Sequence, residues 1–165
     1  MNIREINTDF LFGMSMKQIR LFLIAALATL IGLSCPVSAD DRQDISQLID
    51  AYGQAMSTSD IDAVMRLYTS DSIFMPAGLP TAVGWKAVKK AYEQEFQTID
   101  LDVKDVVDEI VVRSDMAYAR TRAIGHLIVR ETKERKTTDN YRAFFTLRKQ
   151  HGEWKISRFM FNFTK

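Results

Sequence analysis

The sequence predicts an α+β fold in which a curved antiparallel sheet carries three N-terminal helices on one face. Apolar residues recur at helical spacing as far as Gln97, and after Asp100 their period changes to two. Strand-like segments then follow one another across short turns, at Leu101–Arg113, Met116–Val129, Thr137–Lys149 and Glu153–Phe163. Helices gathered on one side of a bent sheet form a cone, and the mouth of a cone is a natural pocket.

A signal peptide is predicted for residues 1–39. Lys17 and Arg20 precede the apolar run Leu21–Leu33, and Val37-Ser38-Ala39 provides a small-residue cleavage site. The run is too short to span a membrane, which takes about 20 residues. We expect cleavage after Ala39 and a periplasmic or secreted product that forms a single domain.

Two further questions at the N-terminus stay open. The chain starts at Met1, or at Met14 or Met16, which would remove a long lead-in. Cys35 is the single cysteine, and as a lipid-modified first residue it would make the product a lipoprotein. Cleavage after Ala39 instead leaves no cysteine, and therefore no disulfide, in the mature chain.

The mature chain is electrically balanced. The leader holds three of the 22 Lys/Arg and two of the 21 Asp/Glu, which leaves 19 of each in residues 40–165. A nucleic-acid partner would require a basic excess on one face, and electrostatic membrane attachment would require a polybasic segment. We therefore expect neither partner after signal cleavage.

The helices are predicted in this order. Asp41–Thr58 carries an apolar stripe made of Ile45, Leu48, Ile49, Tyr52 and Met56. Ser59-Asp60-Ile61-Asp62 is typical of a capping box and starts a second, short helix that runs to about Leu67. A third helix covers Trp85–Gln97, with Val88, Ala91, Tyr92 and Phe96 on its inner stripe.

Strands fill the remaining positions. A brief strand at Ser72–Met75 ends in the loop Pro76–Pro80, because proline cannot donate to a strand ladder. In Leu101–Arg113 the alternation predicts one face with Leu101, Val103, Val107 and Val111, and another with Val106, Ile110 and Val112. Turns at Arg113–Asp115, Glu131–Lys136 and His151-Gly152 join the four long strands into an antiparallel meander.

Several short segments carry a family resemblance. They are Asp60–Ala63, Leu67–Ser72, Phe74–Pro76, Gly84, Ala91-Tyr92 with Phe96, Asp115–Ala119, Gly152–Ile156 and Met160–Asn162. In this order, residues 43–163 resemble the nuclear transport factor 2-like superfamily, a cystatin-like α+β cone. Within it they are most similar to the SgcJ/EcaC group, which is related to SnoaL-like polyketide cyclases.

The resemblance implies a fold more than a reaction, since one such scaffold hosts many activities. Related domains include isomerases, dehydratases, cyclases and non-catalytic binding or assembly modules. We therefore predict a secreted or periplasmic domain that binds a small apolar organic molecule, with isomerase, cyclase or dehydratase-type activity as one hypothesis. A non-catalytic dimerisation or binding module is the alternative, and an oxidoreductase, as the group label implies, is the second alternative.

Two residues are candidate catalytic groups. His126 is in phase with Tyr118, Arg120 and Arg122, and on a concave face it could exchange protons near neutral pH. Asp71, near the expected mouth, could take a proton from a carbon acid if burial raised its pKa. A structural histidine and a turn aspartate are the corresponding alternatives.

Aromatic and amide side chains are the candidate ligand-binding groups. They are Tyr52, Tyr68, Trp85, Tyr92, Phe96, Asn140, Phe161 and Asn162. Rings with polar tips suit an apolar ligand that needs a hydrogen bond, and the alternative for them is ordinary core packing. No dinucleotide-binding glycine motif and no histidine cluster with metal-ligand spacing occurs, so we expect no cofactor and no metal.

The outer side of the sheet is the expected partner surface. Phe144 and Phe145 occupy both phases of one strand, so both sheet faces carry apolar residues. The helices cover one face, and we expect a homodimer to cover the other. Arg120, Arg122 and Arg142 could hold an acidic ligand, and we expect them instead to pair with Asp105 and Glu109 across the strands.

Overall fold

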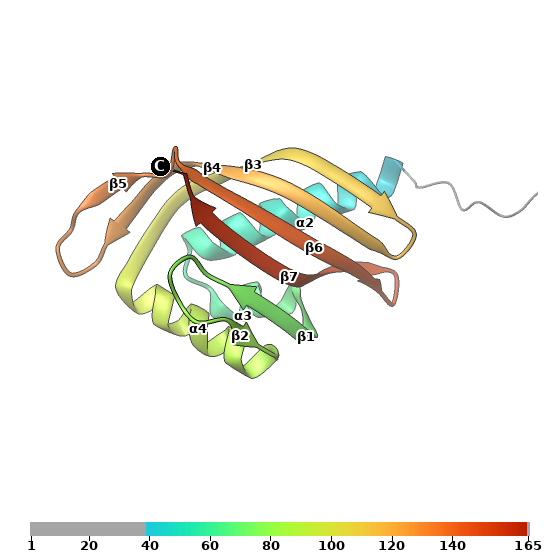
Figure 1. Ribbon diagram of the computed structural model, residues 1–165, viewed down its shortest axis with the longest axis horizontal. Helices are drawn as coiled ribbons and strands as arrows, with labels where there is room; N and C mark the ends of the chain where they lie inside the picture. Colours follow the sequence, from blue (N-terminus) through green and yellow to red (C-terminus); the bar gives the residue numbers. More distant parts are fainter. Residues whose placement is uncertain (1–38, 165) are drawn as a thin grey trace, which may run out of the picture. The chain divides into compact units, whose positions relative to one another are not determined.

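The computed structural model describes residues 39–164, which form a mixed sheet with helices on one face (Figure 1). The apolar run of the predicted signal peptide, Cys35 and the alternative start methionines lie outside the described residues. No helix in the described range is long and apolar enough to cross a membrane. The predicted fold class is confirmed.

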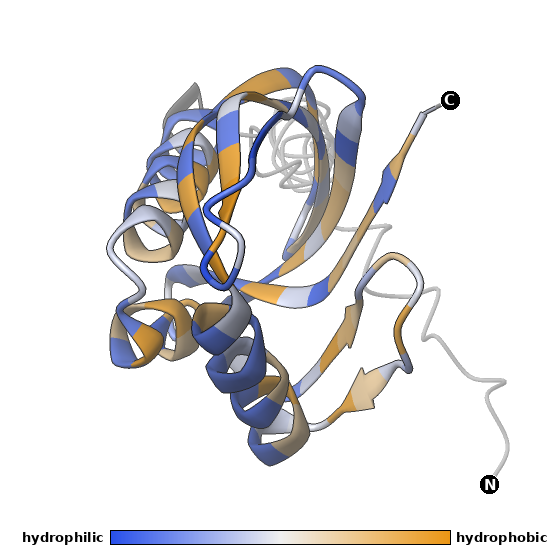
Figure 2. Ribbon diagram, turned by 90° about the vertical axis from the view of Figure 1, so that its left-hand side faces the viewer, coloured by the Kyte–Doolittle hydropathy of each residue, from blue (hydrophilic) through white to orange (hydrophobic). Residues whose placement is uncertain are grey.

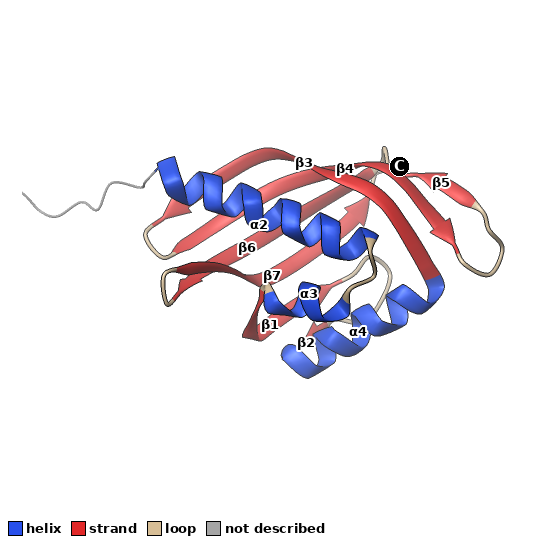
Figure 3. Cartoon of the chain, turned by 180° about the vertical axis from the view of Figure 1, so that it is seen from behind, coloured by secondary structure: helices blue, strands red, loops and turns tan. Residues whose placement is uncertain are grey.

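All three predicted helices are present, as α2 (Ala39–Ser57), α3 (Ile61–Arg66) and α4 (Trp85–Thr98). α3 begins where the sequence predicts it, because the Asp60 carboxylate accepts a hydrogen bond from the Ala63 amide at 2.9 Å. α2 lies across the inner face of the sheet, and α3 and α4 lie on the same side of the sheet as α2 (Figure 3). Ile45, Ile49 and Tyr52 of α2 are buried there.

The sheet has seven strands. They are β1 (Tyr68–Met75), β2 (Ala82–Val83), β3 (Ile99–Arg113), β4 (Met116–Val129), β5 (Arg135–Thr137), β6 (Tyr141–Gln150) and β7 (Glu153–Phe163). Their order is β2-β1-β7-β6-β4-β3, and β5 pairs with β4. The predicted antiparallel meander of β3, β4, β6 and β7 is confirmed.

β1 is longer than the sequence predicts, and it makes the sheet mixed. It begins at Tyr68 rather than Ser72 and runs parallel to β7. The backbone of Leu67 accepts a hydrogen bond from the Ile156 amide at 2.8 Å, which starts the pairing. This partner lies far away in the chain, so local alternation gives no sign of it.

The predicted strand Thr137–Lys149 is divided by a turn. Thr138 leaves the ladder and donates from its hydroxyl to the Ala123 carbonyl at 3.1 Å. The Tyr141 amide then closes the turn on the Thr138 carbonyl at 2.8 Å, and β6 begins at that residue.

A bulge in β3 reverses which side chains in the second half of the strand face the core, so the prediction for this half is wrong. The register with β4 shifts between Val107 and Glu109, so Asp108 has no partner in the ladder. The extra residue reverses the alternation, and Val112 instead of Val111 is buried in the core, at 1% exposure. Bands of hydrophobic and hydrophilic residues alternate along the curved strands (Figure 2), and a second irregularity lies between β6 and β7, where the register shifts between Thr146 and Leu147.

Candidate functional site

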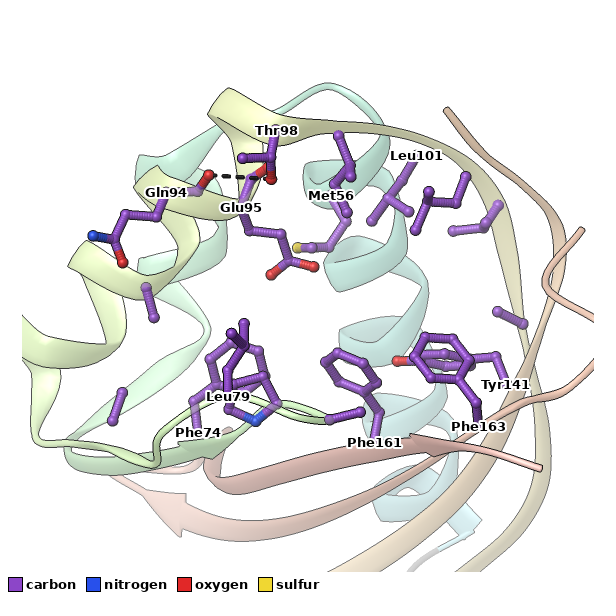
Figure 4. A pocket seen from close by; sticks show the side chains of 18 of the residues that line it. Met56, Phe74, Leu79, Gln94, Glu95, Thr98, Leu101, Tyr141, Phe161 and Phe163 are labelled. Atoms are coloured by element: carbon purple, nitrogen blue, oxygen red, sulfur yellow. Dashed lines mark hydrogen bonds between the residues drawn. The ribbon is translucent and has the colours of Figure 1, made fainter. Parts of the chain in front are cut away.

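A cavity of about 680 Å³ lies between the curved sheet and the helices. Helix α4, the end of α2 and the loop between β1 and β2 contribute to its wall, together with the inner faces of β3, β4, β6 and β7. Figure 4 labels part of the lining, namely Met56, Phe74, Leu79, Gln94, Glu95, Thr98, Leu101, Tyr141, Phe161 and Phe163. A mostly apolar cavity of this size accommodates a drug-sized organic molecule.

Glu95 places a carboxylate in this apolar space. Its side chain extends from α4 toward the middle of the cavity (Figure 4). Within the described part of the chain, the carboxylate forms no hydrogen bond and no ion pair, so burial raises its pKa from 4.5 to about 7. A carboxyl with this pKa both accepts and releases protons near neutral pH.

Asp105 supplies a second carboxyl from β3. It is 9% exposed, and the Thr121 hydroxyl lies 3.5 Å from its Oδ1 atom. Burial raises the pKa of Asp105 to about 6, and the charge of Asp50 acts in the same direction. Gly53 of α2 makes room for it, because a Cβ atom there would lie 3.0 Å from the Asp105 Oδ2 atom.

Three tyrosine hydroxyls form a buried chain that ends at the cavity wall. The Tyr92 hydroxyl lies 2.6 Å from that of Tyr68 and 3.0 Å from that of Tyr52. Tyr52 is the member of the chain that lines the cavity. Burial raises the pKa of all three, so their hydroxyls stay protonated at neutral pH.

Three aromatic rings form one side of the cavity, which we name the aromatic wall: Tyr141, Phe161 and Phe163. The Tyr141 ring centroid lies 5.3 Å from that of Phe161 and 6.1 Å from that of Phe163. The Phe161 and Phe163 rings meet edge to face at 5.8 Å. Burial and the charges of Asp105 and Glu95 raise the pKa of Tyr141, which indicates that both carboxyls lie near the aromatic wall.

The predicted ligand-binding residues divide into three groups. Tyr52 and Phe161 line the cavity, and Tyr68, Tyr92 and Phe96 pack behind it. Trp85 is 38% exposed at the start of α4 and lies under the Lys89 ammonium. Asn140 donates to the Thr164 carbonyl, and Asn162 accepts from Arg142 at 2.6 Å; neither amide is part of the lining.

Neither predicted catalytic residue lies on the cavity. His126 is on the outer side of β4, where its Nδ1 atom and Arg135 form a hydrogen bond of 3.0 Å. Asp71 is exposed on β1 and pairs with Arg148. The Thr69 hydroxyl and the Arg148 guanidinium lower the pKa of Asp71, which makes it a weaker base.

The expected pairing of Asp105 with an arginine is wrong, because Asp105 faces inward. On the outer face Asp108, the bulge residue, pairs with Arg120 at 3.2 Å and with Arg122 at 3.1 Å. The expected pair of Arg120 with Glu109 is present at 3.7 Å.

Both cavity carboxyls leave a signal in the sequence. Glu95 follows Ala91 by four residues and Tyr92 by three, so it falls on the apolar stripe of α4. Asp105 follows Leu101 and Val103 in the same alternation phase. An acidic residue in an apolar phase indicates either a satisfied buried group or a site, and the cavity makes it a site here.

Groups that would hold a metal do not gather in the described range, where no three His, Cys, Asp or Glu side chains come together. The lining instead offers carboxyls, tyrosine hydroxyls and aromatic rings. These are groups for proton transfer and for binding an organic molecule.

Helices over a curved sheet, with an apolar cavity between them, define the class of small cone-shaped α+β domains. The sequence matches the family described as SnoaL-like domain over residues 37–160, and the chain belongs to that family. No curated protein matches the chain.

Solved structures share the fold. A ketosteroid isomerase-like protein of Erwinia carotovora atroseptica is 28% identical with a TM-score of 0.73, over 78% of this chain and 99% of that one. A protein of Novosphingobium aromaticivorans, provisionally named an aromatic ring hydroxylase, is 27% identical with a TM-score of 0.67, over 80% and 93%. A nuclear transport factor 2-like protein of the same organism, with a cystatin-like fold, is 16% identical with a TM-score of 0.64, over 92% and 91%.

Proposed function

We propose that the protein binds a small, mostly apolar carbonyl compound in this cavity and moves a proton within it, as an isomerase does. The observation that carries the proposal is the Glu95 carboxyl, which lies in an apolar cavity without a protein partner among the described residues. A pKa of about 7 leaves near half of this group ionised at neutral pH. It can therefore take a proton and later return it.

The tyrosine chain would supply a hydrogen-bond donor for the carbonyl oxygen of the bound compound. Three hydroxyls carry three protons, and the two hydrogen bonds between them use two. When Tyr68 donates to Tyr92 and Tyr92 donates to Tyr52, the Tyr52 proton is free to bond a ligand oxygen in the cavity. A donor held in place in this way stabilises negative charge that develops on a carbonyl oxygen.

In the proposed step, the Glu95 carboxylate takes a proton from the carbon beside the carbonyl, and the electrons of the broken C–H bond form the C–C π bond of an enolate. The carbonyl π electrons move onto oxygen, which accepts the hydrogen bond from Tyr52. Return of the proton from Glu95 to a carbon further along a conjugated enolate gives the isomer.

The comparisons support this class of reaction. At 28% identity, the relative from Erwinia is named a ketosteroid isomerase-like protein, and ketone isomerisation is a proton transfer of this kind. The non-catalytic binding module stays the alternative, because the same cavity would serve it. The name of the second relative keeps the oxidoreductase alternative open.

Proton exchange at carbon tests the proposal without knowledge of the natural substrate. We would incubate the ketone 2-tetralone with the protein in D₂O and follow loss of its α-proton signals by NMR. A second probe, 3-cyclohexen-1-one, reports isomerisation through the absorbance of the conjugated product. We expect wild type to accelerate both reactions.

Variants assign the roles. Glu95→Gln should slow the catalysed exchange by at least about a hundredfold, and Tyr52→Phe by about tenfold or more. Glu93→Gln, an exposed residue of the same helix, should leave the rate unchanged. Full activity of Glu95→Gln would refute the proposed step, and binding of the ketone without exchange would favour the non-catalytic module.

We also propose export of the protein, which rests on the basic residues and the apolar run before Ala39. The intact mass of the protein recovered from its native host tests this directly. We expect a chain that begins at Asp40. A lipid-modified N-terminus at Cys35 or an uncleaved leader would refute cleavage at that position.

A further inference from the structure

The cavity holds two carboxyls that form no ion pair with a Lys or Arg of residues 39–164. Glu95 has no ion pair within the described range, and the near contact of Asp105 is the neutral Thr121 hydroxyl. Lys90 also lines the cavity, but its side chain is exposed and forms no ion pair with either carboxyl. Buried negative charge without a partner is costly, and a positively charged ligand would offset that cost.

The aromatic wall provides a second, independent feature. Aromatic faces carry negative electrostatic potential and attract ammonium groups within about 6 Å of the ring centre. Tyr141, Phe161 and Phe163 gather at one side of the cavity, with centroids 5.3 to 6.1 Å apart. Figure 4 shows the Glu95 carboxylate directed into the same space that these rings border.

We propose that the cavity selects organic cations, that is, apolar molecules that carry a protonated or quaternary amine. The positive charge would lie against the aromatic wall, with Asp105 and Glu95 as its counter-charges. This inference rests on the proposed function only in that the same cavity binds a small molecule. It adds the chemical class of the ligand, an amine that also bears an oxygen acceptor for Tyr52.

The affinity for a cation should depend on pH. The titratable groups near the two carboxyls are the tyrosines Tyr52, Tyr68, Tyr92 and Tyr141, together with Asp50 of α2. The neutral Thr121 hydroxyl of β4 contacts Asp105, and Lys90 of α4 lines the same cavity. Of the two carboxyls, Asp105 has a pKa of about 6 and Glu95 of about 7. Both gain negative charge between pH 5.5 and pH 8, so the cation should bind more tightly at the upper end.

Two matched probes separate charge from shape. Acetylcholine carries a quaternary ammonium and a carbonyl, and 3,3-dimethylbutyl acetate has the same shape with a carbon atom in place of the charged nitrogen. We would measure both dissociation constants at pH 8 and pH 5.5 by calorimetry. At pH 8 we expect acetylcholine to bind at least tenfold more tightly than the ester without charge, and we expect this ratio to fall at pH 5.5.

Charge-removing variants locate the effect. Asp105→Asn combined with Glu95→Gln should bring the two dissociation constants at pH 8 to within about twofold of each other. Asp102→Asn, on the same strand but exposed, should keep the wild-type ratio.

The wild-type comparison decides the inference even if a variant fails to fold. Equal binding of both probes, or tighter binding of the neutral ester, would overturn the preference for cations and leave the cavity as a ligand site. Binding of neither probe would also overturn it, and the ketone exchange assay would still decide the proposed function on its own.

Discussion

Glu95 and Asp105 are the residues whose chemistry differs most from that of an ordinary acidic side chain. Both are raised in pKa by burial, Asp105 from 3.8 to about 6 and Glu95 from 4.5 to about 7. The folded protein therefore holds these protons more tightly than the unfolded chain does. Linkage then makes the free energy of unfolding fall as pH rises from about 4 to about 7.

Neutral variants should remove this dependence. A pKa difference of two units corresponds to about 3 kcal/mol, so Asp105→Asn or Glu95→Gln should raise the free energy of unfolding at pH 8 by about 1 to 3 kcal/mol. At pH 4 either variant should be close to wild type. Urea denaturation across this pH range measures the effect, with Asp102→Asn as the exposed control. Loss of stability at pH 8 in both variants would show that the carboxyls stabilise the fold.

Strand β4 depends on one glycine where its backbone lies close to that of β3. Gly125 of β4 has a φ angle of 144°, and a Cβ atom there would lie 2.1 Å from the Asp102 carbonyl oxygen of β3. Backbone cannot yield as a flexible side chain does. Gly125→Ala should therefore destabilise the protein by more than about 2 kcal/mol.

The neighbour of this glycine provides the control. Ile124 is 51% exposed on the outer face, so Ile124→Ala should cost less than about 1 kcal/mol. Thermal denaturation of the two variants measures the difference in their stability. Equal stability of both would contradict the close approach of β3 and β4 at this glycine.

Helices and strands with strong local periodicity could be predicted from the sequence. Strand pairings between distant segments, and bulges, could not. The stripe of α4 predicts its inner face and nearly its bounds, and the antiparallel meander follows from short turns. The parallel pairing of β1 with β7 depends on a partner distant in the chain, and the bulge at Asp108 leaves no mark in the alternation of β3 itself.

The site was predictable only in part, for a related reason. Tyr52 and Phe161 line the cavity as expected, because large aromatic rings tend to fill a cone. Alternation cannot say which face of a sheet is concave, so the inward direction of Asp105 and the outward direction of His126 needed the assembled sheet. The role of Glu95 does not follow from the sequence alone, because an acidic residue on a helix is usually solvated.

At the scale of the whole molecule, the outer side of the sheet carries exposed apolar residues. Met116, Ile124 and Met160 are 54%, 51% and 40% exposed, and the rings of Tyr118 and Phe144 stack beside them at 5.4 Å. We predict a homodimer through this face, where exposed apolar side chains border the ion pairs of Asp108 with Arg120 and Arg122, because exposed apolar groups favour association. Light scattering after size-exclusion chromatography should give the mass of a dimer.

Negative charge introduced in place of the exposed apolar side chains of this face should separate the subunits. Ile124→Glu combined with Met160→Glu should give a folded monomer, whereas Val83→Glu, equally apolar and exposed on β2, should remain dimeric. A wild-type protein that is monomeric at tens of micromolar would contradict the prediction.

We propose that the cavity keeps the Glu95 carboxyl partly ionised at neutral pH and therefore able to transfer protons. The carboxyl carbon of Glu95 can be titrated directly by NMR in protein labelled with ¹³C-glutamate, and its signal assigned through its absence in Glu95→Gln. We predict a midpoint near pH 7, well above the ordinary value of 4.5. A midpoint close to 4.5 would show a solvated carboxyl and would contradict its proposed role in proton transfer.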